Sequence, residues 1–342
     1  WVCAFANRQH ALNSEIGSDP LKSSFYKAML LAEGILLHVD SEACVFDRIW
    51  CCFEIYVSLT RPELALDIVA WRDDGSSRRP VLLSEDTLPD ESTRTQVLRE
   101  EAFPIAMLQR GLRTRLQDGH ATVQHDRRVI LDYIAGSVDQ ANASLHGLLA
   151  RVAWRPALMR GLVEDFDQDQ PGTLSLARVL HDDVMNPRLH LNLSFLDVVN
   201  RLALQAVCEG FPANLTDLKL AFQSCVHVDD DGFELLSVHL PTGLKVFHLD
   251  CIGCQGITNH GLALLAKGLP RGLAELTLNF DGCESISEEG IRAMTRALPR
   301  TVKKFRGTFH GTPANCGFAS LHELRVYAAG NKRMLQLYKN LM

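Results

Sequence analysis

The sequence predicts a mixed α/β protein built from more than one structural part. Three observations support this prediction. A pattern of apolar residues recurs every 29 positions in the C-terminal part of the chain. In each repeat, apolar residues first alternate with polar ones, as in a strand, and then recur every three or four positions, as in a helix. In the N-terminal part, short apolar segments typical of strands alternate with segments typical of amphipathic helices. With 342 residues, of which 46% are hydrophobic, the chain is long enough for two or more domains.

The repeat can be followed residue by residue. Its units start at Leu215, Leu244, Leu273 and Val302, and a more degenerate unit starts at Asn186. Apolar residues two positions apart form columns, as expected for a strand with one buried face. The columns contain Leu218, Phe247, Leu276 and Phe305; Leu220, Leu249 and Leu278; and Phe222, Cys251 and Phe280. We therefore predict four repeats over 186–301 and a fragment of a fifth, which together fill 186–310.

A helix follows each predicted strand. It begins near Gly232, Gly261 or Gly290, and its apolar residues are three and four positions apart. These residues are Phe233, Leu236 and Leu240; Leu262, Leu265 and Leu269; and Ile291, Met294 and Leu298. A proline follows each helix, where the missing N–H group does least harm.

This segment resembles the leucine-rich repeats of the cysteine-containing and ribonuclease-inhibitor-like type, with a longer interval between strand and cysteine. The resemblance implies a short solenoid that binds protein partners through the concave face of its sheet. The side chains between the buried columns would line that face. As binding residues we single out Lys219, Gln223, His248, Asp250, Thr277, Asn279 and Asp281. Ala221 and Ile252 occupy the same face.

Cys251 and Cys254 have the spacing of half a zinc site. Cys254, however, has counterparts at Cys225 and Cys283, and a buried cysteine behaves as a small apolar residue. No second cysteine pair at ligand spacing is present, so we expect reduced thiols and no metal. The ten cysteines follow no disulfide framework, which favours a reducing, cytoplasmic compartment.

The net charge of −6 argues against a nucleic-acid surface, and no apolar run is long enough to span a membrane. The chain starts without methionine at an apolar segment, Trp1–Phe5, which we interpret as a strand of an N-terminally truncated domain. We then predict a helix over 23–31, a strand over 35–39, a second helix and a strand over 65–70. The inner face of the second helix contains Phe46, Ile49, Trp50, Phe53 and Val57. This order is typical of a parallel α/β unit.

The segment from Ile35 to Glu54 resembles the central strand and following helix of TIR domains. Trp50, Cys51 and Glu54 match the family's pattern on that helix. In NAD-cleaving members this glutamate is catalytic, so the resemblance implies a truncated TIR-like domain over 1–72 with Glu54 as its catalytic carboxylate. A carboxylate beside a ribosyl centre would offset the positive charge that develops as nicotinamide leaves. In the alternative interpretation, Trp50 only anchors the helix and Glu54 is a solvated surface residue.

Residues 73–185 are predicted to be a helical connector, with helices over 91–102, 105–117, 126–135 and from 141 to Pro156. A cluster of Arg110, Arg113 and Arg115 indicates a solvated face or a contact with an acidic partner. Residues 311–342 are predicted to cap the last repeat with a helix over 321–341.

Three hypotheses for function follow. The first is protein recognition or scaffolding by the repeat surface, including recognition in signalling or sensing, with no cofactor. The second is a TIR-type NAD glycohydrolase that uses Glu54, with NAD as substrate and the repeats as sensor. The third is a purely structural capping protein in a larger assembly.

Overall fold

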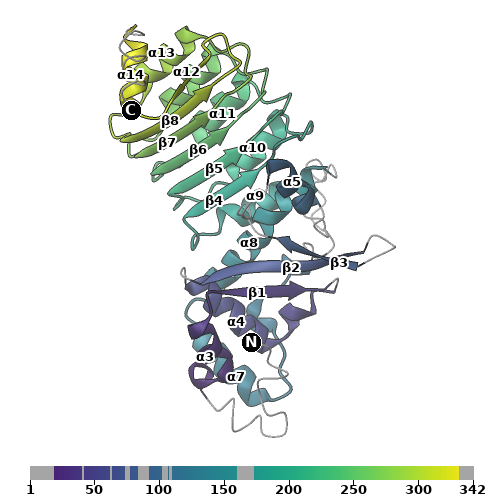
Figure 1. Cartoon of the computed structure of the whole chain (residues 1–342). Coiled ribbons are helices and arrows are strands. Elements are labelled where there is room, and N and C mark those ends of the chain that lie inside the picture. The colour runs from purple at the N-terminus through teal and green to yellow at the C-terminus, as the bar shows by residue number, and fades with distance from the viewer. Residues whose placement is uncertain are drawn as a thin grey trace. The chain divides into compact units, whose positions relative to one another are not determined.

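The computed structural model describes residues 19–40, 42–61, 64–73, 78–83, 92–101, 107, 110–159 and 173–330. The chain divides into two compact units, Trp1–Ala153 and Trp154–Met342, each with its own sheet (Figure 1). The predicted strand at Trp1–Phe5 lies outside the described residues. Among the described residues, no helix has the length and apolar character needed to cross a membrane.

The first unit contains a three-stranded sheet in the order β1-β2-β3. The elements are η1 (Pro20–Lys22), α3 (Ser24–Leu31), β1 (Gly34–Val39), η2 (Cys44–Asp47), α4 (Ile49–Thr60), β2 (Ala65–Asp73), β3 (Arg78–Leu83), α5 (Thr93–Glu101), η3 (Leu116–Asp118) and α7 (Gln124–Ile134). Strands β1 and β2 are parallel, as predicted, because α4 returns the chain to the same edge of the sheet. Strand β3, which lies in the segment predicted to be a helical connector, pairs antiparallel with β2, so the sheet is mixed.

Helix α4 supplies the core of this unit. Ile49, Phe53 and Val57 are buried as predicted, together with Phe46 of η2. Trp50 is only half-buried. Its ring stacks on Phe25 with centroids 5.0 Å apart, and its Nε1 donates to Asp126 Oδ2 at 3.2 Å. Trp50 therefore anchors α4 against α3 and α7, and its indole N–H retains a hydrogen-bond acceptor.

The predicted connector differs from the structure in three places. Residues 78–83 form β3 rather than a helix or loop. The part of the 105–117 segment that the structure describes leaves the helix after Gly111, where Thr114 N donates to Gly111 O and the Thr114 hydroxyl to Arg110 O. Such local bonds compete with the helix. Helix α8 (Val138–Met159) continues past Pro156, since a proline this close to the C-terminus disturbs only the last turn.

The second unit is a run of strand–helix pairs. It contains α9 (Thr173–His181), which we did not predict, and then β4 (Arg188–Asn192), α10 (Arg201–Glu209), β5 (Asp217–Ala221), α11 (Asp230–His239), β6 (Val246–Asp250), α12 (Asn259–Gly268), β7 (Glu275–Asn279), α13 (Glu288–Ala297), β8 (Lys304–Phe309), β9 (Cys316–Phe318) and α14 (Leu321–Ala328). Strands β4 to β8 are parallel and adjacent in chain order, and helices α10 to α13 lie along one side of the sheet (Figure 1).

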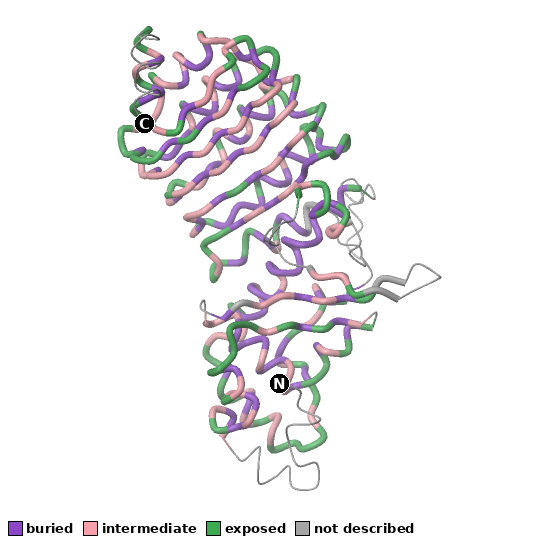
Figure 2. The backbone as a smooth tube through the Cα atoms, in the orientation of Figure 1, coloured by how far each residue is buried: buried purple, intermediate pink, exposed green. Residues whose placement is uncertain are grey.

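The register of the sheet confirms the predicted repeat. Leu220 pairs with Leu249 and Leu249 with Leu278, and all three are at most 2% exposed. Lys219 pairs with His248 and His248 with Thr277 on the opposite face of the strands. Figure 2 shows the resulting alternation of buried and more exposed residues along each strand.

The helices of the repeats begin at capping residues 29 positions apart. The side chains of Asn200, Asp229, Thr258 and Ser287 each accept a hydrogen bond from a backbone N–H in the first turn. The next residue links neighbouring repeats, since Asp230 Oδ1 accepts from Thr258 N at 2.8 Å. This link requires Gly261, because a Cβ there would lie 2.2 Å from the same Asp230 oxygen.

The last parallel strand is followed by a different arrangement. Strand β9 pairs antiparallel with β8, and α14 packs on α13, β8 and β9. A helix was predicted over 321–341, and α14 ends at Ala328, with Ala329 as its C-cap; residues 331–342 lie outside the described residues.

Replacing Leu249 with Asp should unfold the repeats, because an unpaired buried charge costs several kcal/mol. Far-UV circular dichroism and chemical denaturation measure this effect. Thr277→Asp, on the other face of the sheet, is the control and should fold normally. A folded Leu249→Asp protein with unchanged stability would contradict the buried register.

Replacing Gly261 with Ala should destabilise the repeats, although alanine is intrinsically the better helix former by roughly 1 kcal/mol. The new methyl group would displace Asp230 and break its bond to the next repeat, so we expect a net loss of about 1–3 kcal/mol in the free energy of unfolding. Gly243→Ala is the control, since its Cβ would meet only Leu215 O at 3.6 Å. Equal stabilities of the two variants would refute this role of Gly261.

Candidate functional site: the outward face of the repeat sheet

The outward face of β4 to β8 is the side of the sheet opposite the buried leucine columns. All seven residues predicted to bind a partner lie on it or on the turns that directly follow its strands. Lys219 is exposed, and the other six are half-buried among their neighbours. Their positions follow from the strand period, because alternate residues leave the sheet on the same side. Their binding role stays a prediction.

Hydrogen bonds between strands hold many of these side chains in place. Gln223 Nε2 donates to Asp250 Oδ2 at 2.8 Å, and Thr308 Oγ1 donates to Asn279 Oδ1 at 2.8 Å. Asp281 Oδ1 accepts from His310 N at 2.6 Å. Groups that are already ordered lose less conformational entropy when a partner binds.

At the ends of β6 and β7, the side chain of the last strand residue bonds to the backbone of the following turn. Asp250 Oδ1 accepts from Ile252 N at 3.2 Å, and Asn279 Oδ1 accepts from Asp281 N at 3.2 Å. These are turns in which an Asx side chain bonds the backbone two residues on. Strand β5 has Ala221 at this position, and Gln223 N donates instead to Ser194 Oγ at 3.1 Å.

Burial changes the acid–base behaviour of two of these residues. It lowers the pKa of His248, to which nearby Lys219 and His190 also contribute, so His248 favours its neutral form. Burial raises the pKa of Asp250, although bonds from Gln223 and from the backbone of Ile252 oppose this effect. Both shifts show that the centre of the face is partly shielded from water.

The cysteine column lies inside the array. The thiols of Cys225, Cys254 and Cys283 donate to carbonyl oxygens of the preceding repeat, at 3.1, 2.9 and 3.1 Å. Each of these residues is fully buried, and burial raises the pKa of Cys225 and Cys283 to about 12. Among the described residues, no cluster of three or more His, Cys, Asp or Glu has the arrangement of a metal site.

Glu54 lies on α4, one turn after Trp50, and is half-buried. Burial raises its pKa to about 7, and Arg48 opposes the shift. A carboxyl group with this pKa exchanges protons near neutral pH, which is a property of catalytic acids but also of any carboxyl that the fold shields from water.

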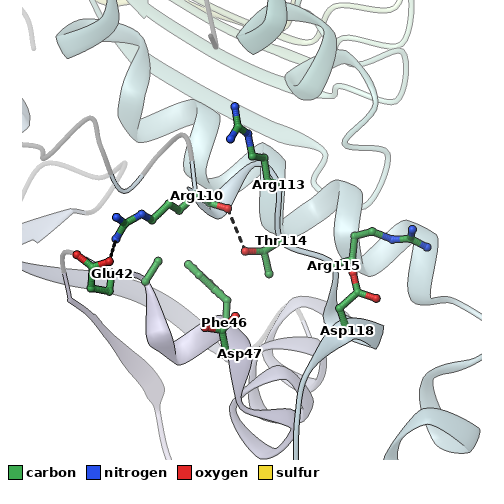
Figure 3. A pocket seen from close by; sticks show the side chains of 9 residues that line it. Glu42, Phe46, Asp47, Arg110, Arg113, Thr114, Arg115 and Asp118 are labelled. Carbon is green, nitrogen blue, oxygen red and sulfur yellow. Dashed lines mark hydrogen bonds and ion pairs between the residues drawn. The ribbon is translucent and has the colours of Figure 1, made fainter. Parts of the chain in front are cut away.

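The first unit has a cavity of about 350 Å³ beyond the end of β1, and Glu54 does not line it (Figure 3). Its walls are the loop before α4 and the turn around Thr114, so the predicted arginine cluster does come together with other polar residues. The lining residues are Glu42, Ala43, Phe46, Asp47, Arg110, Arg113, Thr114, Arg115 and Asp118. Arg110 forms an ion pair with Glu42, whereas Figure 3 shows Arg113 and Arg115 extending away from that pair. The three arginines therefore do not converge on one point.

Sequence reasoning missed several residues of the outward face. Counting 29 residues back from Lys219 and on from Thr277 leads to His190 on β4 and Arg306 on β8, which the register places in the same row. The same count leads from Glu275 to Lys304, whose Nζ lies 2.6 Å from Glu275 Oε1. The repeat spacing was thus the signal that could have found them.

Comparison with solved structures finds a remote likeness to a leucine-rich-repeat protein. The leucine-rich repeat-containing protein LegL7 of Legionella pneumophila is 19% identical to this chain, with a TM-score of 0.30. The match covers 39% of this chain and 42% of that chain, so the chain spans less than half the length of this neighbour. No family model matches the sequence, and no curated protein matches it.

Replacing Glu54 with Gln should stabilise the first unit at high pH. The folded state binds the Glu54 proton more tightly than the unfolded state, whose carboxyl has the ordinary pKa near 4.5. The associated stability is present below pH 4.5 and is lost as the pH rises through 7. Because the glutamine side chain cannot ionise, we expect a gain of about 1–3 kcal/mol at pH 8 and little change at pH 5.

Urea denaturation at both pH values measures this difference. Glu42→Gln, at an exposed ion pair, should change stability by less than about 1 kcal/mol at either pH. An equal effect of Glu54→Gln at pH 5 and pH 8 would contradict the raised pKa.

Proposed function

We propose that this chain recognises a protein partner through the outward face of its leucine-rich-repeat solenoid. One observation carries the proposal: an ordered, polar sheet face extends over five parallel strands, with helices α10 to α13 on the other side. A surface of this kind can contact many residues of a partner at once. Several of its polar side chains, among them Gln223, Asp250 and Asn279, are held by neighbouring strands, so these groups gain little order on binding.

The composition of the face fits a protein better than a small molecule. Charged, amide and hydroxyl groups alternate with the half-buried apolar residues Val246, Ile252 and Ala221. Protein interfaces typically combine hydrogen-bonding groups with such apolar contacts. We infer that the apolar residues contribute contact area and that the charged residues of the outward face select the partner.

The alternative hypothesis, an NAD glycohydrolase, stays an untested prediction. It needs a cleft in which a ribose can reach the Glu54 carboxylate. The cavity described in the first unit is lined by other residues, and the raised pKa of Glu54 has burial as its first cause. We therefore propose recognition alone. Scaffolding and signalling would be consequences of recognition rather than separate activities of the face.

A photo-crosslinking amino acid at position 277 should capture the partner in the cells that produce this protein. The control places the same group at position 267, on α12 and on the helix side of the sheet. We expect a crosslinked protein from position 277 and none of the same identity from position 267.

The captured protein, once purified, should bind the unmodified chain. Thr277→Arg should weaken this binding by about tenfold or more, because a long charged side chain at the centre of the face blocks contact. Crosslinks that arise only from position 267, or binding that Thr277→Arg leaves intact, would refute recognition by the outward face.

A further inference from the structure

One row of the outward face contains no acidic residue. It runs across the strands through His190, Lys219, His248, Thr277 and Arg306, which are register partners on β4 to β8. We call these five residues the basic row. Lys219 and Arg306 are exposed, whereas His190, His248 and Thr277 are half-buried.

The carboxylates on the rest of the face are already engaged with neighbouring groups. Asp217 Oδ1 lies 3.8 Å from His190 Nε2, and Glu275 pairs with Lys304. Asp250 accepts from Gln223, and Asp281 accepts from the backbone of His310. Each of these four carboxylates therefore has a partner within the array, and Glu275 is the one paired with a permanently charged side chain.

Lys219 and Arg306 differ in this respect. Within the part of the chain that the structure describes, neither side chain takes part in an ion pair or a hydrogen bond. His248, between them in the row, favours its neutral form because burial lowers its pKa, while the neighbouring charges act in both directions. Lys219 and Arg306 are thus two exposed cationic side chains in the one row of the face that contains no carboxylate.

The spacing of the two exposed charges limits what can bind them. They lie on β5 and β8, three strand intervals apart, which corresponds to about 14 Å. An extended chain advances by roughly 3.3–3.6 Å per residue, so two of its carboxylates about four residues apart would span this distance. Between them the segment would cross His248 and Thr277, which offer a neutral ring and a hydroxyl group.

We propose that the basic row holds an extended acidic segment of the protein partner, which crosses the strands from β5 to β8. This proposal rests on the proposed function and specifies the chemistry of the partner. One carboxylate pairs with the Lys219 ammonium and another with the Arg306 guanidinium. The guanidinium suits a carboxylate particularly well because it can donate two parallel hydrogen bonds.

A nucleic acid fits this row less well. Its phosphates form a continuous line of negative charge, and Asp217, Asp250, Glu275 and Asp281 flank the row on either side. A peptide can place its two carboxylates only where the row is positive. The net charge of −6 also disfavours a polyanion without such spacing.

Selection from a displayed library of random twelve-residue peptides on the full chain tests the proposal. We expect the enriched peptides to carry Asp or Glu at positions about four residues apart. Their affinity should fall by about tenfold or more in the double variant Lys219→Glu, Arg306→Glu, because attraction becomes repulsion at both ends. The control is Lys267→Glu, Arg296→Glu, which changes the net charge equally on α12 and α13 and should alter binding less than twofold.

The outcomes separate this proposal from the proposed function. Enriched peptides that lack acidic residues, yet lose binding in Thr277→Arg, would overturn the acidic partner and leave recognition by the face intact. Peptides that bind all variants equally would overturn both. Tighter binding of a single-stranded oligonucleotide than of the acidic peptides, lost in the Lys219 and Arg306 variant, would also overturn the proposal. Matching thermal midpoints of the variants would exclude loss of folding as the cause.

Discussion

The backbone hydrogen bonds between successive repeats are the constraint on which the second unit depends. They continue beyond the strands into the turns: Phe222 N donates to Asp250 O at 2.7 Å, and Cys251 N to Asn279 O at 2.8 Å. The turns then bring carbonyl groups into the interior, where they need partners. Phe222 O accepts from Cys225 N at 3.1 Å, and the thiol of Cys254 adds a second donor at 2.9 Å. The stacked turns thus give each buried thiol of the column a carbonyl acceptor in the preceding repeat.

The same stacking forces one residue in each turn into the left-handed region. These residues are Phe195, Ser224, Gly253, Gly282 and Gly311, with φ of 62°, 56°, 71°, 74° and 70°. Glycine adopts this conformation without steric cost, whereas a bulky side chain does so only when the surroundings impose it. Phe195 is exposed, so its own packing does not explain its conformation. The backbone hydrogen bond from Phe195 N to Gln223 O of the next repeat, at 2.7 Å, explains it. The hydrogen bonds between repeats therefore hold Phe195 in a conformation that a bulky residue rarely adopts.

Repetition explains how much of the structure could be predicted. Leu220, Leu249 and Leu278 are three observations of one position, so the strand, its register and its outward face followed from the sequence. The first unit has one copy of each element. The three apolar residues 81–83 are too short a run to identify β3, and the turn at Thr114 depends on a side-chain hydrogen bond that sequence spacing does not reveal. Within the outward face, Arg306 was missed because the fifth unit was treated as a fragment. The pKa of Glu54 depends on how far the fold buries its side chain, which the residue pattern of α4 does not show.

A series of aromatic side chains closes the C-terminal end of the repeats, next to β8 and Arg306. Cys251 occupies a column that otherwise holds Phe222 and Phe280. Its side chain is smaller than a phenyl ring, and the rings of Phe233 and Phe280 contact each other with centroids 5.9 Å apart. From Phe280 the rings continue through Phe309, Phe318 and Tyr327, at 5.7, 6.2 and 5.1 Å.

These rings fill the interior where the leucine column stops at Gly307, at which a Cβ would lie 2.8 Å from the Phe305 ring. Strand β9 then covers the free edge of β8, which would otherwise pair with other chains. The aromatic cap thus packs on β8 from the inside through Phe309, and β9 pairs with the three residues that directly follow Arg306. The backbone positions of Lys219 and Arg306 are therefore kept at a fixed separation, and the spacing of carboxylates that we propose depends on this separation.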